Sequence, residues 1–286
     1  MHHFAMGERI QGMASPSYLI FWVSLAVQAT PGAVHAGEAA APWPIAVPGH
    51  VPVQAGEHPR LFFRRSDLPA LRNRAESAEG KQILTRLRAT LGGGEAMPTA
   101  YNQRPPVNTG AVGPTEMPLG AFTLWHSVGF GFLHQITGEA RYAALARTCV
   151  EKVLAGQGDR DERYNWAMPG AINRGGPILA SMAMAYDLCY DAWDPDFRSS
   201  IAREMMTYSK APVNFGHHND GKRGPVSFDL LAMKPNMPTQ SNHIGSELGG
   251  VGLTALALRG DPGVDGATIE RYLATIDRRI DASTST

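Results

Sequence analysis

One segment restricts the possible folds of this chain more than any other. Residues 175–186 read GGPILASMAMAY and contain no charged side chain. A helix that is apolar on every side must be buried on every side. The segment therefore predicts an inner helix, surrounded by other elements of a layered domain.

The neighbouring segments are helical as well. Apolar residues recur every three or four positions over 139–154, and Asp194-Pro195 is placed to begin another helix with a cap and a proline at its first position. The same spacing predicts further helices over about 79–91, 117–136, 241–258 and 268–280. No segment alternates convincingly enough to be a strand. We therefore predict an all-α fold over 58–286, an incomplete α/α toroid of helical hairpins, with an irregular helical domain as the alternative.

The first residues are typical of an export signal. Tyr18–Ala29 is apolar and is followed by the small-residue pattern Val34-His35-Ala36, which predicts a signal peptide over 1–36. An uncleaved anchor is the alternative. Residues 37–57 are predicted to be a linker, and no later segment is apolar enough to span a bilayer. We expect a periplasmic or secreted protein with no membrane contact after cleavage.

Charge and cysteine content exclude some classes of function. Lys and Arg number 26, as do Asp and Glu, so the formal net charge is zero and no basic face for nucleic acid is expected. The chain has only two cysteines, Cys149 and Cys189. Export permits a disulfide between them, but their apolar helical neighbours favour buried free thiols. No cysteine cluster predicts a metal site, and no cofactor is expected.

Three motifs resemble the heparinase II/III-like polysaccharide lyases. The first is His58-Pro-Arg-Leu-Phe-Phe together with Ser66-Asp-Leu-Pro-Ala-Leu, and the second is Ala185-Tyr-Asp-Leu-Cys-Tyr-Asp with Asp194-Pro195. The third, Ser241-Asn-His-Ile-Gly-Ser-Glu-Leu-Gly-Gly, is similar to the asparagine-histidine motif of their active site. Together the motifs cover most of residues 58–265.

The resemblance implies an α/α toroid, followed in whole family members by a β-sandwich. It also implies β-elimination on polysaccharides that contain uronic acid, such as heparan sulfate or alginate. Asn242 would bind the uronate carboxylate and His243 would take part in proton abstraction. The tyrosine that completes proton transfer would lie well past His243. We therefore expect this chain to be the N-terminal part of such an enzyme, and a poor catalyst by itself.

The residues of the third motif also suggest this chemistry without the resemblance. A lyase must remove a weakly acidic proton α to a carboxylate, so it needs an anion site and a base. Asn242 and His243 stand at a predicted helix start, where free N–H groups favour an anion. Glu247, four residues after His243, shares its face and could orient its ring. The alternative is that Asn242 is only a helix cap and His243 a polar residue at the rim.

Other candidate residues have structural alternatives. Arg174, at the start of the uncharged helix, could clamp a carboxylate or form an ordinary ion pair. Trp166 and Tyr164 could stack on sugars or belong to the core. His217, with its neighbour His218, could touch substrate or a metal.

Tyr208 and Tyr272 are candidate acids, although Tyr208 fits the inner stripe of its helix. The long loops 93–116 and 212–240 are expected to lie at the same end as His243, where they would form the rim of a cleft.

We thus predict a lyase that acts on an acidic polysaccharide. One alternative is a glycoside hydrolase that pairs Glu247 with Asp187 or Asp191. Another is a non-catalytic glycan-binding module.

Overall fold

The computed structural model describes most of the chain after its first 48 residues. The described residues are 49, 51–100, 119–213, 224–233 and 243–284. Internal contacts divide the chain into Met1–Val51 and Pro52–Thr286, and only the second unit is considered below. The predicted signal peptide, most of both long loops, and the site residues His217 and Asn242 lie outside the described residues.

Helices account for nearly all of the regular structure that is described, which confirms the all-α prediction. They are α1 (Leu68–Ala75), α2 (Ala78–Thr90), α3 (His126–Thr137), α4 (Ala140–Leu154), α5 (Ile172–Cys189), α6 (Pro195–Met206), α7 (Phe228–Met233), α8 (Gly249–Leu258) and α9 (Gly266–Thr284). A short antiparallel ladder joins β1 (Ser209–Lys210) to β2 (Val226–Ser227). The prediction of a loop over 212–240 was wrong in its described middle part, because β2 and α7 lie within it. Within the described part of the chain, no helix is both long and apolar enough to cross a bilayer.

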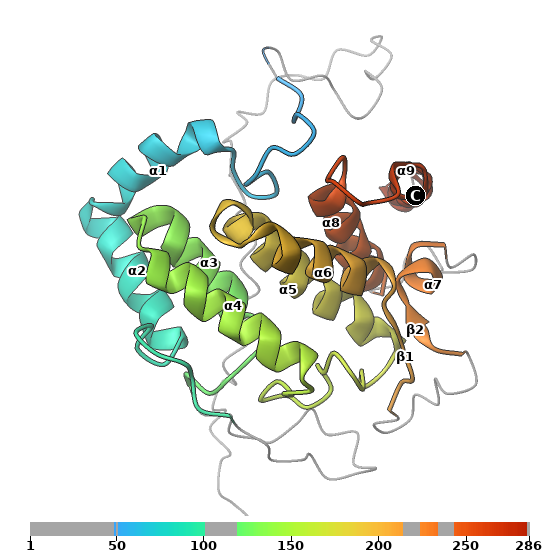
Figure 1. The fold of residues 1–286 in the computed structure, drawn as a ribbon, viewed down its shortest axis with the longest axis horizontal. Coiled ribbons are helices and arrows are strands. Elements are labelled where there is room, and N and C mark those ends of the chain that lie inside the picture. Colours follow the sequence, from blue (N-terminus) through green and yellow to red (C-terminus); the bar gives the residue numbers. More distant parts are fainter. Residues whose placement is uncertain (1–48, 50, 101–118, 214–223, 234–242, 285–286) are drawn as a thin grey trace, which may run out of the picture. The chain divides into compact units, whose positions relative to one another are not determined.

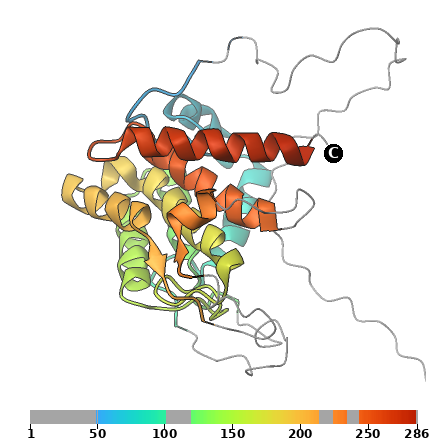
Figure 2. The ribbon, with the colours of Figure 1, turned by 90° about the vertical axis from the view of Figure 1, so that its right-hand side faces the viewer.

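Three successive hairpins, α3/α4, α5/α6 and α8/α9, organise the helices (Figure 1). The first helices of these hairpins form a row in which α5 packs between α3 and α8. Each second helix packs on its own partner, and α9 also contacts α7, as Figure 2 shows from the side. Hairpins in series are what the predicted toroid requires, while closure into a ring stays a prediction.

Local sequence signals set several helix boundaries. The Asp194 carboxylate accepts a hydrogen bond from the Phe197 N–H at 2.9 Å, and Pro195 stands at the first position of α6, as predicted. Gly138 ends α3 in the left-handed region, with φ 76°. The prediction of a helix over 117–136 was wrong at its beginning, because α3 starts only at His126. Residues before it bond to other loops instead, for example through the Phe122 N–H, which donates to the Thr99 carbonyl.

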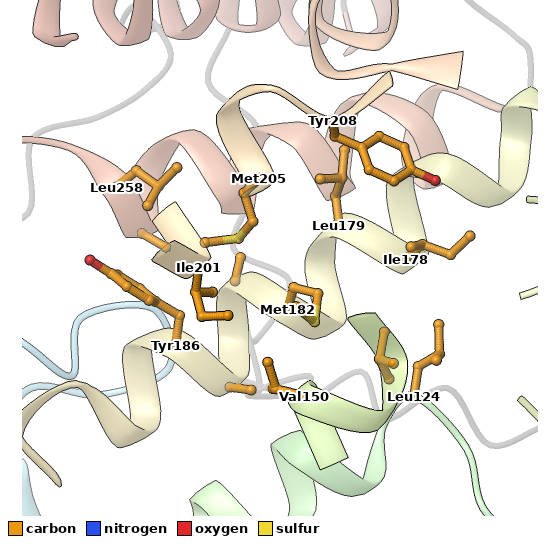
Figure 3. Close-up of a cluster of buried hydrophobic side chains, with 14 of the residues drawn as sticks. Leu124, Val150, Ile178, Leu179, Met182, Tyr186, Ile201, Met205, Tyr208 and Leu258 are labelled. Carbon is orange, nitrogen blue, oxygen red and sulfur yellow. The ribbon is translucent and has the colours of Figure 1, made fainter. Parts of the chain in front are cut away.

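The core lies between the two helices of each hairpin. Figure 3 shows the part around Met182 of α5, with Ile201 and Met205 of α6 and Val150 of α4 close by. Nearly every residue of α5 is buried, as its lack of charge predicted. Cys149 and Cys189 are buried and unlinked, which is the free-thiol alternative.

Two glycines bring the backbones of α5 and α8 together. A Cβ atom on Gly176 would lie 1.9 Å from the Ser246 carbonyl oxygen, and one on Gly250 would lie 2.1 Å from the Gly176 carbonyl oxygen. Real Cβ atoms do not approach other atoms so closely. Only glycine therefore permits this contact, which fixes the position of the segment before α8 against the start of α5.

A buried polar network holds the other ends of α5 and α8. The His58 Nδ1 atom lies 2.7 Å from the Asp187 Oδ1 atom, and Nε2 lies 3.1 Å from the Asp261 Oδ1 atom. All three side chains are buried. Asp187 also accepts from the backbone N–H groups of Arg60 and Leu61, each at 3.0 Å. The HPRLFF motif thus joins the end of α5 to Asp261, three residues after the end of α8. Because the starts of the two helices also meet, at Gly176 and Gly250, α5 and α8 run in the same direction.

Candidate functional site

The predicted pair of His243 and Glu247 is formed in the structure. The His243 Nδ1 atom lies 3.1 Å from the Glu247 Oε1 atom. The Glu247 side chain is fully buried, whereas that of His243 is 34% exposed. A buried carboxylate on one ring nitrogen fixes the orientation of the imidazole and favours a proton on Nδ1. Nε2 is then the ring nitrogen that can act as a base.

The segment that carries this pair is a π-helical turn, Ile244–Leu248, which continues directly into α8. Single π turns inside α-helices are uncommon and occur frequently at functional sites. Here the turn lies against the first turns of α5, because Gly176 contacts the backbone of Ser246 and Glu247. The local sequence predicted a helix in which His243 and Glu247 share one face, but it gave no sign of the wider π turn.

Arg174 stands at the same end of the helix row. It is the third residue of α5, its guanidinium carbon lies 5.3 Å from the centre of the Tyr164 ring, and its side chain is partly buried. Its Nε atom is buried without a hydrogen-bond partner, and no ion pair to Arg174 is present among the described residues. A cation in the first turn of a helix faces the positive end of the dipole, which is unfavourable by about 0.3–1 kcal/mol. An anion bound at this position would relieve that repulsion.

The two aromatic residues near Arg174 differ in exposure. Trp166 is 1% exposed and packs on Tyr208, with 4.6 Å between ring centres. Trp166 thus belongs to the core, which was the alternative to sugar stacking. Tyr164 is half-buried beneath Arg174. Burial raises the pKa of the Tyr164 phenol, and the charge of Arg174 opposes that rise.

Neither candidate tyrosine is positioned as a catalytic acid. Tyr208 is 2% exposed in the core, where burial raises the pKa of its phenol, and its hydroxyl has no partner among the described residues. The Tyr272 hydroxyl donates to Asp229 at 3.0 Å on the side of α9 that faces α7. Burial raises the pKa of the Tyr272 phenol, and the hydrogen bond to Asp229 raises it further. Both residues serve packing between helices.

The carboxylates required by the hydrolase alternative lie far from Glu247. Asp187 follows Gly176, the neighbour of Glu247, by eleven residues of α5, which is about 16 Å at about 1.5 Å per residue. The two carboxylates of a glycosidase are only about 5–9.5 Å apart. Asp187 is also saturated by N–H donors, and Asp191 is an exposed residue paired with Arg65. The structure thus contradicts the pairing of Glu247 with either residue.

Two buried titratable groups near the start of α3 were not predicted. Burial raises the pKa of the Asp159 carboxyl to about 7, although this group accepts hydrogen bonds from the Leu124 and Asp161 N–H groups. Burial lowers the pKa of His126 to about 4. Only an exposed-looking loop sequence surrounds Asp159, so no signal in the sequence indicated its burial. Within the described ranges, no group of three or more His, Cys, Asp or Glu could hold a metal ion.

Comparison with known proteins adds no relative. No family model matches the chain, and no curated protein matches it significantly.

Proposed function

We propose that this protein binds acidic polysaccharide and takes part in its cleavage by β-elimination at a uronic-acid unit. The observation that carries the proposal is the half-exposed His243 imidazole held at 3.1 Å by the fully buried carboxylate of Glu247. The partner class follows from Arg174, a cation at the same end of the fold with no carboxylate partner among the described residues.

In the proposed reaction, His243 removes the proton α to the uronate carboxylate. The electron pair of that C–H bond forms a carbon–carbon double bond, and the bond from the β-carbon to the glycosidic oxygen breaks. Glu247 holds the ring in position and stabilises the imidazolium that results. Arg174 and Asn242, the neighbour of His243 in its motif, offset the negative charge that builds up on the uronate carboxylate during proton removal.

The departing oxygen needs a proton in the same reaction. Tyr208 and Tyr272 are engaged in packing, so neither is assigned this role. The imidazolium of His243 could return its proton only if it reached the leaving oxygen on the same face of the sugar. We therefore expect slow elimination by this chain, limited by protonation of the leaving group.

The test is an elimination assay with alginate and heparan sulfate, followed by the near-ultraviolet absorbance of unsaturated uronate ends. We expect a weak signal that His243→Ala lowers by about 10²–10⁴-fold, the usual contribution of a positioned base. Glu247→Gln should also lower it, by up to about 10⁴-fold, as a comparable carboxylate-to-amide change does in a protease triad. Elimination that is unchanged in His243→Ala would remove the base assignment.

A glycan-binding module without catalysis is the second candidate. The partly buried Arg174, which has no ion-pair partner among the described residues, favours it equally. Binding distinguishes the two. If His243→Ala and the unmodified chain bind an alginate tetrasaccharide equally well and neither forms unsaturated ends, the binding function stands and the lyase proposal fails.

A further inference from the structure

One large aromatic side chain, Trp125, is exposed at the start of α3. Trp125 is 42% exposed, although it belongs to an apolar segment in which Phe122 and Leu124 are only 1% and 2% exposed. It stands immediately before α3, at the capping position, and provides no side-chain cap. Its ring makes no aromatic, cation–π or hydrogen-bond contact with any described residue.

The position of Trp125 on α3 explains its exposure. Phe130 stacks on Tyr142 of α4, with ring centres 6.5 Å apart, and Gly131 packs on Leu188 of α5. At about 100° per residue, Trp125 points about 140° away from Phe130 and about 120° away from Gly131. The indole is thus directed away from both helices that bury the rest of α3.

Trp125 and Arg174 each stand at the N-terminal end of their own helix, α3 and α5. The loop between α4 and α5 bonds to the segment before α3, because the Arg160 N–H donates to the Phe122 carbonyl and the Leu124 N–H donates to Asp159. That loop leads directly to the first turn of α5, so α3 and α5 begin at one end.

The offset along the helices separates Trp125 from Arg174. Gly131 of α3 lies level with Leu188 of α5. Gly131 follows Trp125 by six residues, and Leu188 follows Arg174 by fourteen. The difference of eight residues corresponds to about 12 Å at about 1.5 Å per residue. A single sugar ring cannot contact both side chains, whereas neighbouring units of one oligosaccharide can.

We infer that Trp125 is a stacking platform for a sugar ring of an acidic glycan whose carboxylate-bearing neighbour is held by Arg174. The indole offers a flat apolar face to the C–H groups of a pyranose, and its exposed surface is desolvated on binding. The guanidinium of Arg174, which forms no ion pair with any described residue, supplies the charge complementarity that selects an acidic chain over a neutral one. The inference rests on the proposed substrate class, and it requires no catalytic step.

The experiment measures binding to the whole chain with an alginate tetrasaccharide as the acidic probe and cellotetraose as the neutral one. The indole N–H resonance of Trp125, assigned by its loss in Trp125→Phe, reports contact directly. We expect it to shift with the acidic probe, and Trp125→Ala to weaken affinity about tenfold or more, with a smaller loss in Trp125→Phe. Arg174→Gln should weaken binding of the acidic probe and leave the response to cellotetraose unchanged.

Ile83→Ala is the matched control, since Ile83 is 47% exposed on α2 and should not affect affinity. An unchanged Trp125 resonance in the presence of either probe at millimolar concentration would overturn the platform. So would an affinity in Trp125→Ala that equals that of Ile83→Ala. A shift of Trp125 without any elimination by the chain leaves the platform standing and counts only against the lyase proposal.

Discussion

The contact between α5 and α8 makes a sharp prediction about two adjacent glycines. In Gly250→Ala, the new methyl group would lie 2.1 Å from the carbonyl oxygen of Gly176 and 2.2 Å from its carbonyl carbon. In Gly249→Ala, nothing lies within 4 Å of the new atom. The same chemical change at neighbouring positions should therefore have opposite effects on the free energy of unfolding.

The magnitudes follow from the geometry. An ordinary Cβ contact begins at 3.4 Å, so Gly250→Ala must separate the two backbones by roughly 1 Å, and backbone cannot move aside as a side chain can. Overpacking of this kind costs about 1–3 kcal/mol and sometimes more. Gly249→Ala replaces a helical glycine without a clash and should stabilise by up to about 1 kcal/mol. The two variants should differ by about 2–4 kcal/mol.

Urea unfolding followed by circular dichroism measures the difference, and thermal melting checks it. For a domain of this size, about 1 kcal/mol corresponds to a shift in Tm of roughly 2–4 °C. Gly250→Ala should also weaken glycan binding more than Gly249→Ala, because the displaced backbone carries His243 and Glu247. Equal stability of the two variants would refute the close packing of α5 on α8 and the position of the π turn derived from it.

Three further predictions concern buried charges. Asp187→Asn should lower the free energy of unfolding by about 3–5 kcal/mol, because it leaves His58 and two N–H donors without their carboxylate. Asp191→Asn, which alters an exposed ion pair, should lower it by less than about 1 kcal/mol in the same urea titration. Burial raises the pKa of Asp159 to about 7, so the stability that this group contributes is lost as pH rises from about 4 to about 7. The free energy of unfolding of Asp159→Asn, relative to the unmodified chain, should therefore rise over that window by up to about 4 kcal/mol. A difference that stays constant with pH would contradict the burial. The lowered pKa of His126, about 4, has the opposite sign: stability is present above pH 6.5 and lost toward pH 4, a loss that His126→Asn should reduce in melts recorded across that range.

Local sequence determined most of the helices and which residues are neighbours within them, although it missed α7 and placed the start of α3 too early. The apolar spacing located α4, α5, α6 and α9, and Asp194 capped α6 as its residue type requires. The contact between His243 and Glu247 could also be predicted, since residues four apart share one face of a helix. These features depend on interactions within a few residues, which a local pattern records.

Tertiary structure decided which side chains the packing covers. Trp125 and Trp166 are the same residue type in similarly apolar surroundings, yet one is 42% exposed and the other 1%. The difference depends on whether a distant segment packs against each ring, as Tyr208 does against Trp166, and no local pattern contains that information. The network of His58, Asp187 and Asp261 joins residues up to 203 positions apart, so the chain must already be folded before these groups meet. Periodicity thus located most helices of this protein, and only their packing decided which charges are buried together and which aromatic ring remains exposed.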